Sequence, residues 1–286
     1  MTSRADFRHF ERLRVRWAEV DLQKIVFNGH YLMYFDTAVA GYWRSMALPY
    51  HTTMDHLGGD LYVRKATLEY NASARYDDLI DVGIKTARIG NSSMVLAGGV
   101  FRGDELLVGG ELVYVFANPA TQTSLPVPQD LREVLTAFEA GKAMLDVRVG
   151  TWDVLGREAA ALRTQVFVLE QKIPAEMECD AADASALHAV AYNHFGLALA
   201  TGRLLEHMPG LSRIGRMAVL ASLRGSRIGR AVLDALVQAA RARGDQQVLL
   251  HAPASAIPFY SRAGFVAQGP AFEEAGIPHQ AMVKAL

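Results

Sequence analysis

RVRWAEVDLQKIVFNGHYLMYFDTAVAGYW, residues 14–43, is the stretch that decides the fold of the first half of the chain. Residues 11–17 alternate apolar and polar side chains, which is typical of a strand. After an irregular segment, residues 29–46 place apolar side chains at helical spacing: Tyr31, Tyr34, Phe35, Ala38, Tyr42 and Met46. We therefore expect one buried helix, which Pro49 ends.

Residues 60–118 follow this helix and have the pattern of strands throughout. Their apolar segments are separated by short polar or glycine-containing turns: Asp77-Asp78, Gly90-Asn91 and Gly103-Asp104. Such punctuation is typical of an antiparallel meander. One long helix beside an antiparallel sheet predicts an α+β fold for the first domain.

The segment NPATQTSLPVP, residues 118–128, contains three prolines and no periodicity, so we place the end of the first domain at residue 128. Residues 129–144 are expected to form a linker helix, and residues 145–286 a second domain. The length of 286 residues agrees with two domains.

Composition excludes several classes of protein. Lys plus Arg number 29 and Asp plus Glu 30, so the formal net charge of −1 provides no basic field for nucleic acid or an anionic membrane. Cys179 is the one cysteine, which excludes an internal disulfide and a multi-cysteine metal site. For the same reason we expect no metal. We also expect a cytoplasmic protein, because no apolar run can span a bilayer and the N-terminus lacks the apolar segment of a signal peptide.

Three features of the opening stretch have a family likeness. They are Glu19-Val20-Asp21, then Ile25-Val26-Phe27-Asn28, then Tyr31. With the strands downstream, they resemble the hotdog-fold thioesterases of the YbgC and 4-hydroxybenzoyl-CoA thioesterase type over about residues 7–128. The resemblance implies a long helix against an antiparallel sheet and an acyl-CoA substrate.

The resemblance assigns the chemistry of thioester hydrolysis to Asp21, as nucleophile or base, and the polarising amide to the backbone of Asn28. This fits the physics, because an acid before a helix start can activate water while free N–H groups at that start stabilise an oxyanion. The alternative is a purely structural role, in which Asp21 and Glu19 are solvated loop acids and Asn28 only caps the helix. One departure from the family is a missing glycine around Lys24, which restricts the backbone beside the site.

The second half alternates strands and helices, which suggests an α/β sheet. We expect strands at residues 145–150, 188–193, 196–205, 213–220, 246–252, 265–268 and 280–284. We expect helices at residues 153–171, 228–243 and 255–263.

RIGRMAVLASLRGSRIGRAVLDA, residues 213–235, joins a strand to a helix through a glycine-containing loop. Glycines before a helix N-terminus let backbone N–H groups surround a pyrophosphate. The stretch resembles motif A of the GNAT N-acetyltransferases. The pairs Phe259-Tyr260 and Gly264-Phe265 match a second motif of that family. Residues 166–171 and 272–279 are similar to the ElaA-type branch, so the resemblance covers residues 145–286 and implies a GNAT fold with a mixed sheet.

The GNAT resemblance implies a role for each matching residue. Met217, Ala218 and Val219 would offer backbone groups to the pantetheine arm of CoA. The pyrophosphate would bind to the loop residues Arg224, Gly225, Ser226, Arg227, Ile228, Gly229 and Arg230. Tyr260 would protonate the leaving thiolate, unless it is only a packed aromatic side chain.

Three features of this half bear on its activity. Arg227 replaces the first glycine of the motif, which strains the loop if its φ is positive and reshapes the loop if it is not. The base that deprotonates an amine acceptor has four candidates: Glu170, Glu178, His188 and His279. Cys179 lies among acidic residues, which disfavours a reactive thiolate.

Together the two resemblances predict a bifunctional CoA-dependent protein. One half would hydrolyse an acyl-CoA, and the other would transfer an acyl group, expected to be acetyl, from acetyl-CoA to an amine. The alternative is an acyl-CoA-binding regulatory or scaffold protein in which one domain is inactive. Because hotdog domains usually pair, we also expect a homodimer or homotetramer through the first domain.

Overall fold

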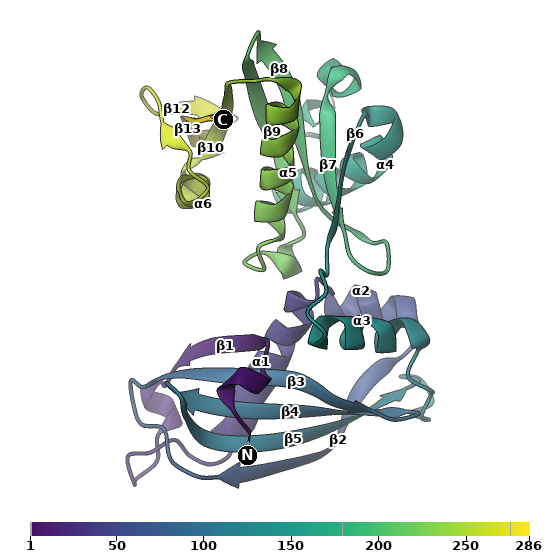
Figure 1. The fold of residues 1–286 in the computed structure, drawn as a ribbon, viewed down its shortest axis with the longest axis vertical. Helices are drawn as coiled ribbons and strands as arrows, with labels where there is room; N and C mark the ends of the chain where they lie inside the picture. The colour runs from purple at the N-terminus through teal and green to yellow at the C-terminus, as the bar shows by residue number, and fades with distance from the viewer. Residues whose placement is uncertain (1, 179, 275) are drawn as a thin grey trace. The chain divides into compact units, whose positions relative to one another are not determined.

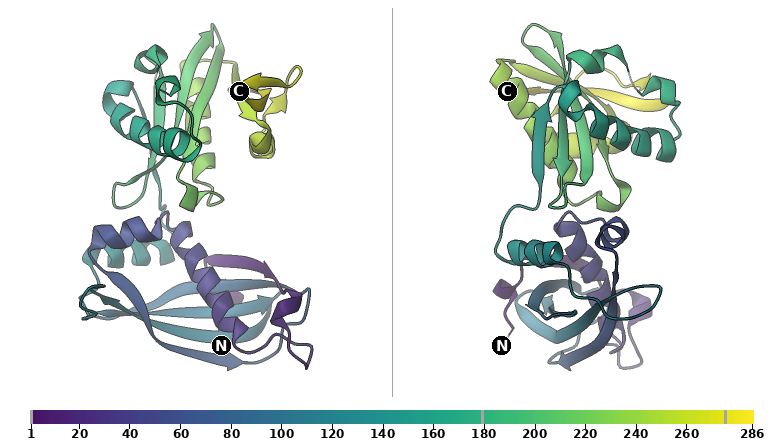
Figure 2. Two further views of the ribbon diagram at one scale, coloured as in Figure 1. Left: turned by 180° about the vertical axis from the view of Figure 1, so that it is seen from behind. Right: turned by 90° about the vertical axis from the view of Figure 1, so that its right-hand side faces the viewer.

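The computed structural model describes residues 2–178, 180–274 and 276–286, and the chain divides into two compact units, Met1–Met144 and Leu145–Leu286 (Figures 1 and 2). The elements of the first unit are η1 (Arg4–Asp6), β1 (His9–Arg14), η2 (Trp17–Glu19), α1 (His30–Ser45), α2 (Tyr50–Leu57), β2 (Asp60–Tyr70), β3 (Leu79–Ile89), β4 (Ser93–Arg102), β5 (Glu105–Ala117) and α3 (Gln129–Glu139). The strands form one antiparallel sheet in the order β1-β3-β4-β5-β2.

The long helix α1 lies across one face of this sheet (Figure 2). Its Phe35 is fully buried against two paired glycines, Gly98 on β4 and Gly110 on β5. A Cβ atom at Gly98 would lie 2.4 Å from the Phe35 ring, so only glycine permits this approach of the helix to the sheet. The predicted α+β arrangement and its long helix are therefore confirmed.

The helix α3 packs within the first unit. Its Leu131, Val134 and Leu135 are completely buried. At its end Glu139 accepts hydrogen bonds from the Tyr42 hydroxyl of α1 at 2.5 Å and from the Thr86 N–H of β3 at 2.8 Å. These contacts attach the segment to both the central helix and the sheet. The short helix α2, by contrast, was not predicted, because Pro49 both ends the pattern of the preceding helix and forms the N-cap of α2, and the sequence signal shows only the first role.

The second unit contains β6 (Asp146–Gly150), α4 (Trp152–Arg163), the π-helix η3 (Thr164–Glu170), η4 (Ala175–Met177), η5 (Ala181–Ser185), β7 (Leu187–Tyr192), β8 (Ala198–Met208), β9 (Leu211–Val219), η6 (Ala221–Leu223), α5 (Ile228–Arg243), β10 (Gln247–Pro253), η7 (Ala254–Ala256), α6 (Ile257–Arg262), β11 (Val266–Ala267), β12 (Phe272–Glu274) and β13 (Ile277–Ala285). The sheet order is β11-β13-β10-β9-β8-β7-β6, with β12 paired to β13. Figures 1 and 2 show α5 on one face and α4 on the other.

The sheet of the second unit is mixed, as the resemblance implies. Its neighbours run antiparallel except for β9 and β10, which are parallel and are connected through α5. The predicted helix 228–243 matches α5 to the residue. The predicted helix 153–171 is instead α helix to Arg163 and π-helix from there to Glu170. The hairpin strand β12 was not predicted, because three residues are too few to show a periodicity.

Candidate functional site

The loop between β9 and α5 presents a row of backbone N–H groups. Gly225 (φ 86°) and Arg227 (φ 67°) both adopt the left-handed conformation, which turns the chain into the first turn of α5. Within the described ranges, no hydrogen bond engages the N–H groups of Gly225, Arg227, Ile228, Gly229 and Arg230. Such N–H groups at a helix N-terminus form an anion-binding concavity.

Gly229 allows the start of α5 to approach the end of β9. A Cβ atom at Gly229 would lie 3.1 Å from Val219 Cγ2 and 3.9 Å from the Phe259 ring. The backbone conformation of Arg227 is strained, because a non-glycine residue in the left-handed region costs about 1–3 kcal/mol of folding free energy. The sequence alone leaves the φ of Arg227 undetermined, and the structure shows the strained alternative, with φ 67°.

The arginines of the loop differ in how they are engaged. Arg224 makes a bidentate ion pair with Glu170, at 2.6 and 2.7 Å. Arg230 pairs with Asp234 at 2.8 Å and donates to the carbonyl of Arg262 at the end of α6. Arg227 is exposed, and no described residue forms a hydrogen bond or ion pair with its side chain. Arg227 is therefore the loop arginine whose charge is available to a ligand.

The strands β9 and β10 separate beside this loop. Their parallel pairing stops at Ile214 and Leu250, although β9 continues to Val219. From there on β9 pairs only with β8 among the described strands, through Gly215, Ala218 and Val219. The second edge of residues 217–219 is thus open, and the backbone groups predicted to meet a pantetheine arm lie on it.

Tyr260 lies on α6, which contacts the start of α5 through the hydrogen bond from Arg230 to Arg262. Its side chain is 7% exposed and packs edge-on against Phe259 and Phe265. Burial raises the pKa of Tyr260 to about 12. The phenol therefore holds its proton at neutral pH, as a general acid requires.

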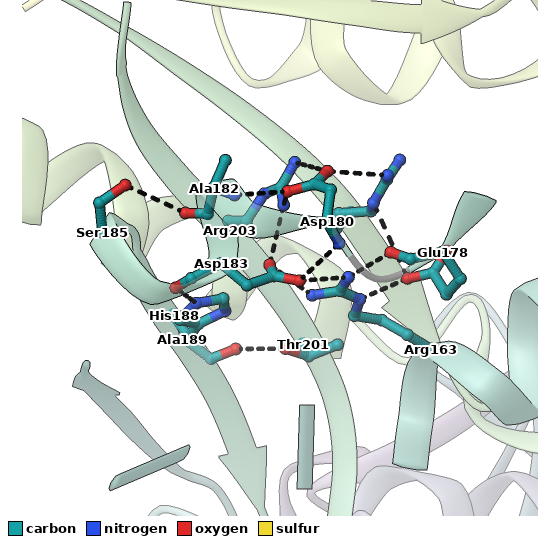
Figure 3. Close-up of polar contacts among 11 residues, drawn as sticks. Arg163, Glu178, Asp180, Ala182, Asp183, Ser185, His188, Ala189, Thr201 and Arg203 are labelled. Atoms are coloured by element: carbon teal, nitrogen blue, oxygen red, sulfur yellow. Dashed lines mark hydrogen bonds and ion pairs between the residues drawn. The ribbon is translucent and has the colours of Figure 1, made fainter. Parts of the chain in front are cut away.

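A buried cluster of charges occupies another part of the second unit (Figure 3). Arg163 is 1% exposed and forms ion pairs with Glu178 and Asp183. Arg203 joins the cluster through Asp183 at 2.8 Å and Asp180 at 2.7 Å. Because each of these buried charges has an opposite partner, none of them is free for a substrate, and removal of one partner would leave an uncompensated buried charge.

This cluster accounts for two of the four base candidates. Glu178 is neutralised by Arg163, and His188 is completely buried with its Nε2 3.0 Å from the carbonyl of Asp183. Burial lowers the pKa of His188, so its ring stays neutral and enclosed. Glu170 is held by Arg224. His279 is partly exposed with Nδ1 2.8 Å from the Ile277 carbonyl, and Cys179 lies outside the described residues.

In the first unit, Asp21 begins a tight turn. Its N–H donates to the carbonyl of Ile25 and its Oδ1 accepts the N–H of Gln23 at 2.8 Å. Lys24 adopts the left-handed conformation in this turn, with φ 62°. The missing family glycine therefore corresponds to a position where a side chain costs about 1–3 kcal/mol.

Glu19, two residues earlier, is a structural acid. It is 4% exposed and accepts hydrogen bonds from Tyr34 of α1 at 2.8 Å and from the backbone and side chain of Arg16. Burial favours its neutral form, but these hydrogen bonds hold the pKa of Glu19 below its usual value. The alternative that both acids are solvated is therefore wrong for Glu19, while Asp21 is partly exposed.

Asn28 directly precedes the N-cap residue of α1, which is Gly29. The N–H groups of Asn28 and Gly29 have no hydrogen-bond acceptor among the described residues, and the Asn28 side chain does not cap the helix. The carbonyl of Asn28 accepts the Tyr70 hydroxyl at 3.2 Å. The helix start thus offers the two donors that an oxyanion would need.

The structure adds a hollow that the sequence analysis missed. It has a volume of about 710 Å³ and is lined by Ile25, Ala72, Ser73, Arg75, Asp78 and Arg102. Ile25 and Arg75 form a β-bridge, so the hollow adjoins the Asp21 turn.

Across the described ranges, no group of three or more His, Cys, Asp or Glu could hold a metal ion. Nor is any described helix both long and apolar enough to cross a membrane.

Comparison with known proteins follows the same division of the chain. Residues 155–286 match the family model "Acetyltransferase (GNAT) domain", and residues 23–109 match "Thioesterase superfamily". The uncharacterized N-acetyltransferase YjcF of Bacillus subtilis is 35% identical over 129 residues, 45% of this chain and 91% of the relative. Protein ElaA of Escherichia coli is 31% identical over 43% of this chain and 82% of its own length. A putative esterase of Aquifex aeolicus is 27% identical over 43% of this chain and 94% of its own.

Proposed function

Because its C-terminal half belongs to the GNAT acetyltransferase family and its N-terminal half to the thioesterase superfamily, we propose that this chain acts on CoA thioesters at two separate sites. The C-terminal site transfers an acetyl group from acetyl-CoA to an amine. The N-terminal site hydrolyses an acyl-CoA. Neither site requires a metal.

The observation that supports acetyl transfer most directly is the set of free N–H groups at Gly225 and at residues 227–230. It binds the pyrophosphate of CoA, and Arg227 adds a positive charge. The pantetheine arm then follows the open edge of β9 at residues 217–219, which leads from the loop to the point where β9 and β10 separate. Tyr260 protonates the sulfur that leaves.

Asp21 and the start of α1 support acyl-CoA hydrolysis. The partly exposed carboxylate of Asp21 activates water or attacks the thioester, and the N–H groups of Asn28 and Gly29 stabilise the oxyanion. Arg75 and Arg102 line the adjoining hollow and suit the negatively charged part of the substrate. Arg102 is partly neutralised by Asp78 and Glu105, which leaves Arg75 as the stronger anion contact.

Release of CoA from short, medium, long and aromatic acyl-CoAs, followed with a thiol reagent and no amine, tests the hydrolysis. Asp21→Asn keeps the hydrogen bond to Gln23 but removes the charge, so we expect a loss of at least ~10²-fold with folding unchanged. Tyr260→Phe serves as the matched control, since it alters only the other unit. Hydrolysis at the wild-type rate in Asp21→Asn would exclude this mechanism.

For the transfer reaction, Tyr260→Phe is expected to lower kcat while acetyl-CoA still binds. Calorimetry with acetyl-CoA measures the binding independently of any acceptor. Failure of the wild-type protein to bind acetyl-CoA would exclude the transferase function.

A second candidate is a regulatory protein that binds acyl-CoA at one inactive domain. The strained backbones of Lys24 and Arg227, one beside each site, favour it, because both replace a glycine of the family motif. Tight binding of acyl-CoA by calorimetry without any release of CoA would support this candidate over the enzyme.

A further inference from the structure

Three charged or titratable side chains meet on one face of the second unit. His251 of β10 places its Nδ1 2.8 Å from Glu274 Oε2 of β12 and 3.0 Å from Arg213 Nη2 of β9. Arg213 Nη2 lies 3.7 Å from Glu274 Oε1. The three residues come from separate strands, and none of them was a candidate in the sequence analysis.

His251 lies where the strands begin to separate. Leu250 and Ile214 form the last parallel pair, and His251 is the next residue along β10. On the proposed function, the thioester end of the pantetheine arm reaches this apex along the open edge of β9. His251 is therefore the first residue of β10 beyond the last parallel pair, at the end of the path that this arm would follow.

The imidazole of His251 is partly accessible to solvent. Val248, Leu250 and Ala252 are buried, so alternation along the strand directs His251 to the opposite side. The His251 side chain is 27% exposed, and its ring packs edge-on against the Phe272 ring. The Phe272 ring also stacks on the ring of His279. An acceptor amine can therefore approach the ring.

The partners of Nδ1 determine which nitrogen can accept a proton. Burial favours the neutral form of Glu274, but the hydrogen bond with His251 and the charges of His251, Arg213 and His279 hold the pKa of Glu274 below its usual value. Nδ1 can hydrogen-bond to only one of its two neighbours at a time, to Glu274 when it carries a proton and to Arg213 when it does not, because a guanidinium only donates. In the tautomer that donates its Nδ1–H to the ionised Glu274, Arg213 serves only as the ion-pair partner of Glu274, and the lone pair of the neutral ring is on Nε2. No described residue forms a hydrogen bond with Nε2.

We propose that His251 is the general base of the acetyl transfer and that Glu274 is the positioning residue that holds its tautomer. The proposal rests on the transferase function proposed above. Nε2 takes one proton from the ammonium group of the acceptor, and the freed nitrogen lone pair attacks the thioester carbonyl carbon. The C–S bond then breaks, with its electron pair on sulfur. The thiolate takes the proton of Tyr260, the amide nitrogen returns its second proton to the phenolate, and His251 releases its proton to water.

Two probe amines of different basicity test the role of His251. Benzylamine is an ammonium ion at neutral pH and needs a base, whereas aniline is already neutral. We expect His251→Gln to lower kcat/KM for benzylamine by ~10²-fold or more, and for aniline by less than ~10-fold. His207→Ala, a change at an exposed histidine of β8, is the matched control and should equal the wild type for both amines.

The pH profile tests the role of Glu274. The charged or titratable groups near the His251 imidazole are Arg213, Glu274 and His279. The variant Glu274→Gln alters only Glu274. We expect this variant to lower kcat and move the acid limb of the kcat/KM profile, with the KM for acetyl-CoA unchanged. A purely structural residue would not move that limb.

The outcomes separate the proposal from the function on which it rests. If the wild type acetylates benzylamine and His251→Gln does so equally well, the base is wrong but the transferase stands. If the wild type neither binds acetyl-CoA nor acetylates either amine, the transferase itself is wrong. Nitrogen-15 NMR of the acetyl-CoA complex gives a test without turnover, because a proton on Nε2 of neutral His251 would overturn the proposal.

Discussion

Glu170, the last residue of the π-helix η3, holds the guanidinium of Arg224 with both carboxylate oxygens, at 2.6 and 2.7 Å. The pair connects the segment after α4 to the first residue of the anion-binding loop. The hydrogen bond from Arg224 lowers the pKa of Glu170, so the carboxylate is ionised at neutral pH. A bound pyrophosphate would compete with this carboxylate for the same guanidinium.

Removing the competing charge should therefore strengthen CoA binding. We expect Glu170→Gln to lower the Kd for CoA by up to ~5-fold, since an exposed ion pair is worth at most about 1 kcal/mol. Calorimetry with CoA measures the change, and Glu206→Gln provides a charge-matched control on β8. Weaker binding in Glu170→Gln would show instead that the pair holds the loop in its binding conformation.

The left-handed backbone of Arg227 can be separated from its charge. Arg227→Gly and Arg227→Ala both remove the guanidinium, but only glycine adopts φ 67° without strain. We expect the two variants to bind CoA equally weakly, while the glycine variant has a free energy of unfolding about 1 kcal/mol higher than the alanine variant. Urea unfolding of the second unit measures the difference. Equal stabilities would mean that the loop relaxes and stores no strain.

The buried charge cluster predicts an acid-sensitive stability of the second unit. Although burial favours its neutral form, hydrogen bonds from Arg163 and Arg203 lower the pKa of Asp183 from 3.8 to about 2. Because the folded pKa is depressed, the stabilisation is present above about pH 4 and is lost as the pH falls towards 2. Asp183→Asn should remove about 3–5 kcal/mol at neutral pH, since it leaves Arg163 and Arg203 short of a charge.

Urea unfolding at several pH values checks this prediction. The wild type should lose more stability than Asp183→Asn between pH 4 and pH 2. Asp146→Asn, which breaks the exposed pair with Arg148, should leave both values near those of the wild type. A loss of less than about 1 kcal/mol in Asp183→Asn would contradict the assigned role.

The edge strand β2 predicts self-association of the first unit. β2 lies at the end of the sheet, with exposed Tyr62 and Val63 and a row of backbone groups on its outer edge. Such an edge is a template for pairing with another chain. We expect light scattering to give a mass of at least twice 31.3 kDa, and Val63→Lys to reduce it. Val266→Lys changes an even more exposed valine of the second unit (67% against 56% for Val63) and is the control. A wild-type mass of 31.3 kDa would refute the prediction.

Local patterns predicted the elements that depend on neighbours in sequence. The helix α1 follows from apolar side chains at helical spacing, and α5 from the glycine and arginine loop before it and Gly244 after it. These signals also indicated the two families whose models match the chain, since each motif consists of contiguous residues. Even the departures at Lys24 and Arg227 were visible, because each stands where the family motif has a glycine.

Only the tertiary structure decided which acids and bases are free to react. Glu19 and Asp21 are two residues apart, yet Tyr34 buries the first and leaves the second partly exposed. Glu178 and His188 are enclosed by Arg163 and its partners, whereas His251 meets Glu274 from 23 residues away. The physical reason is that burial and hydrogen bonding between distant residues depend on strand register and packing, which local periodicity does not encode.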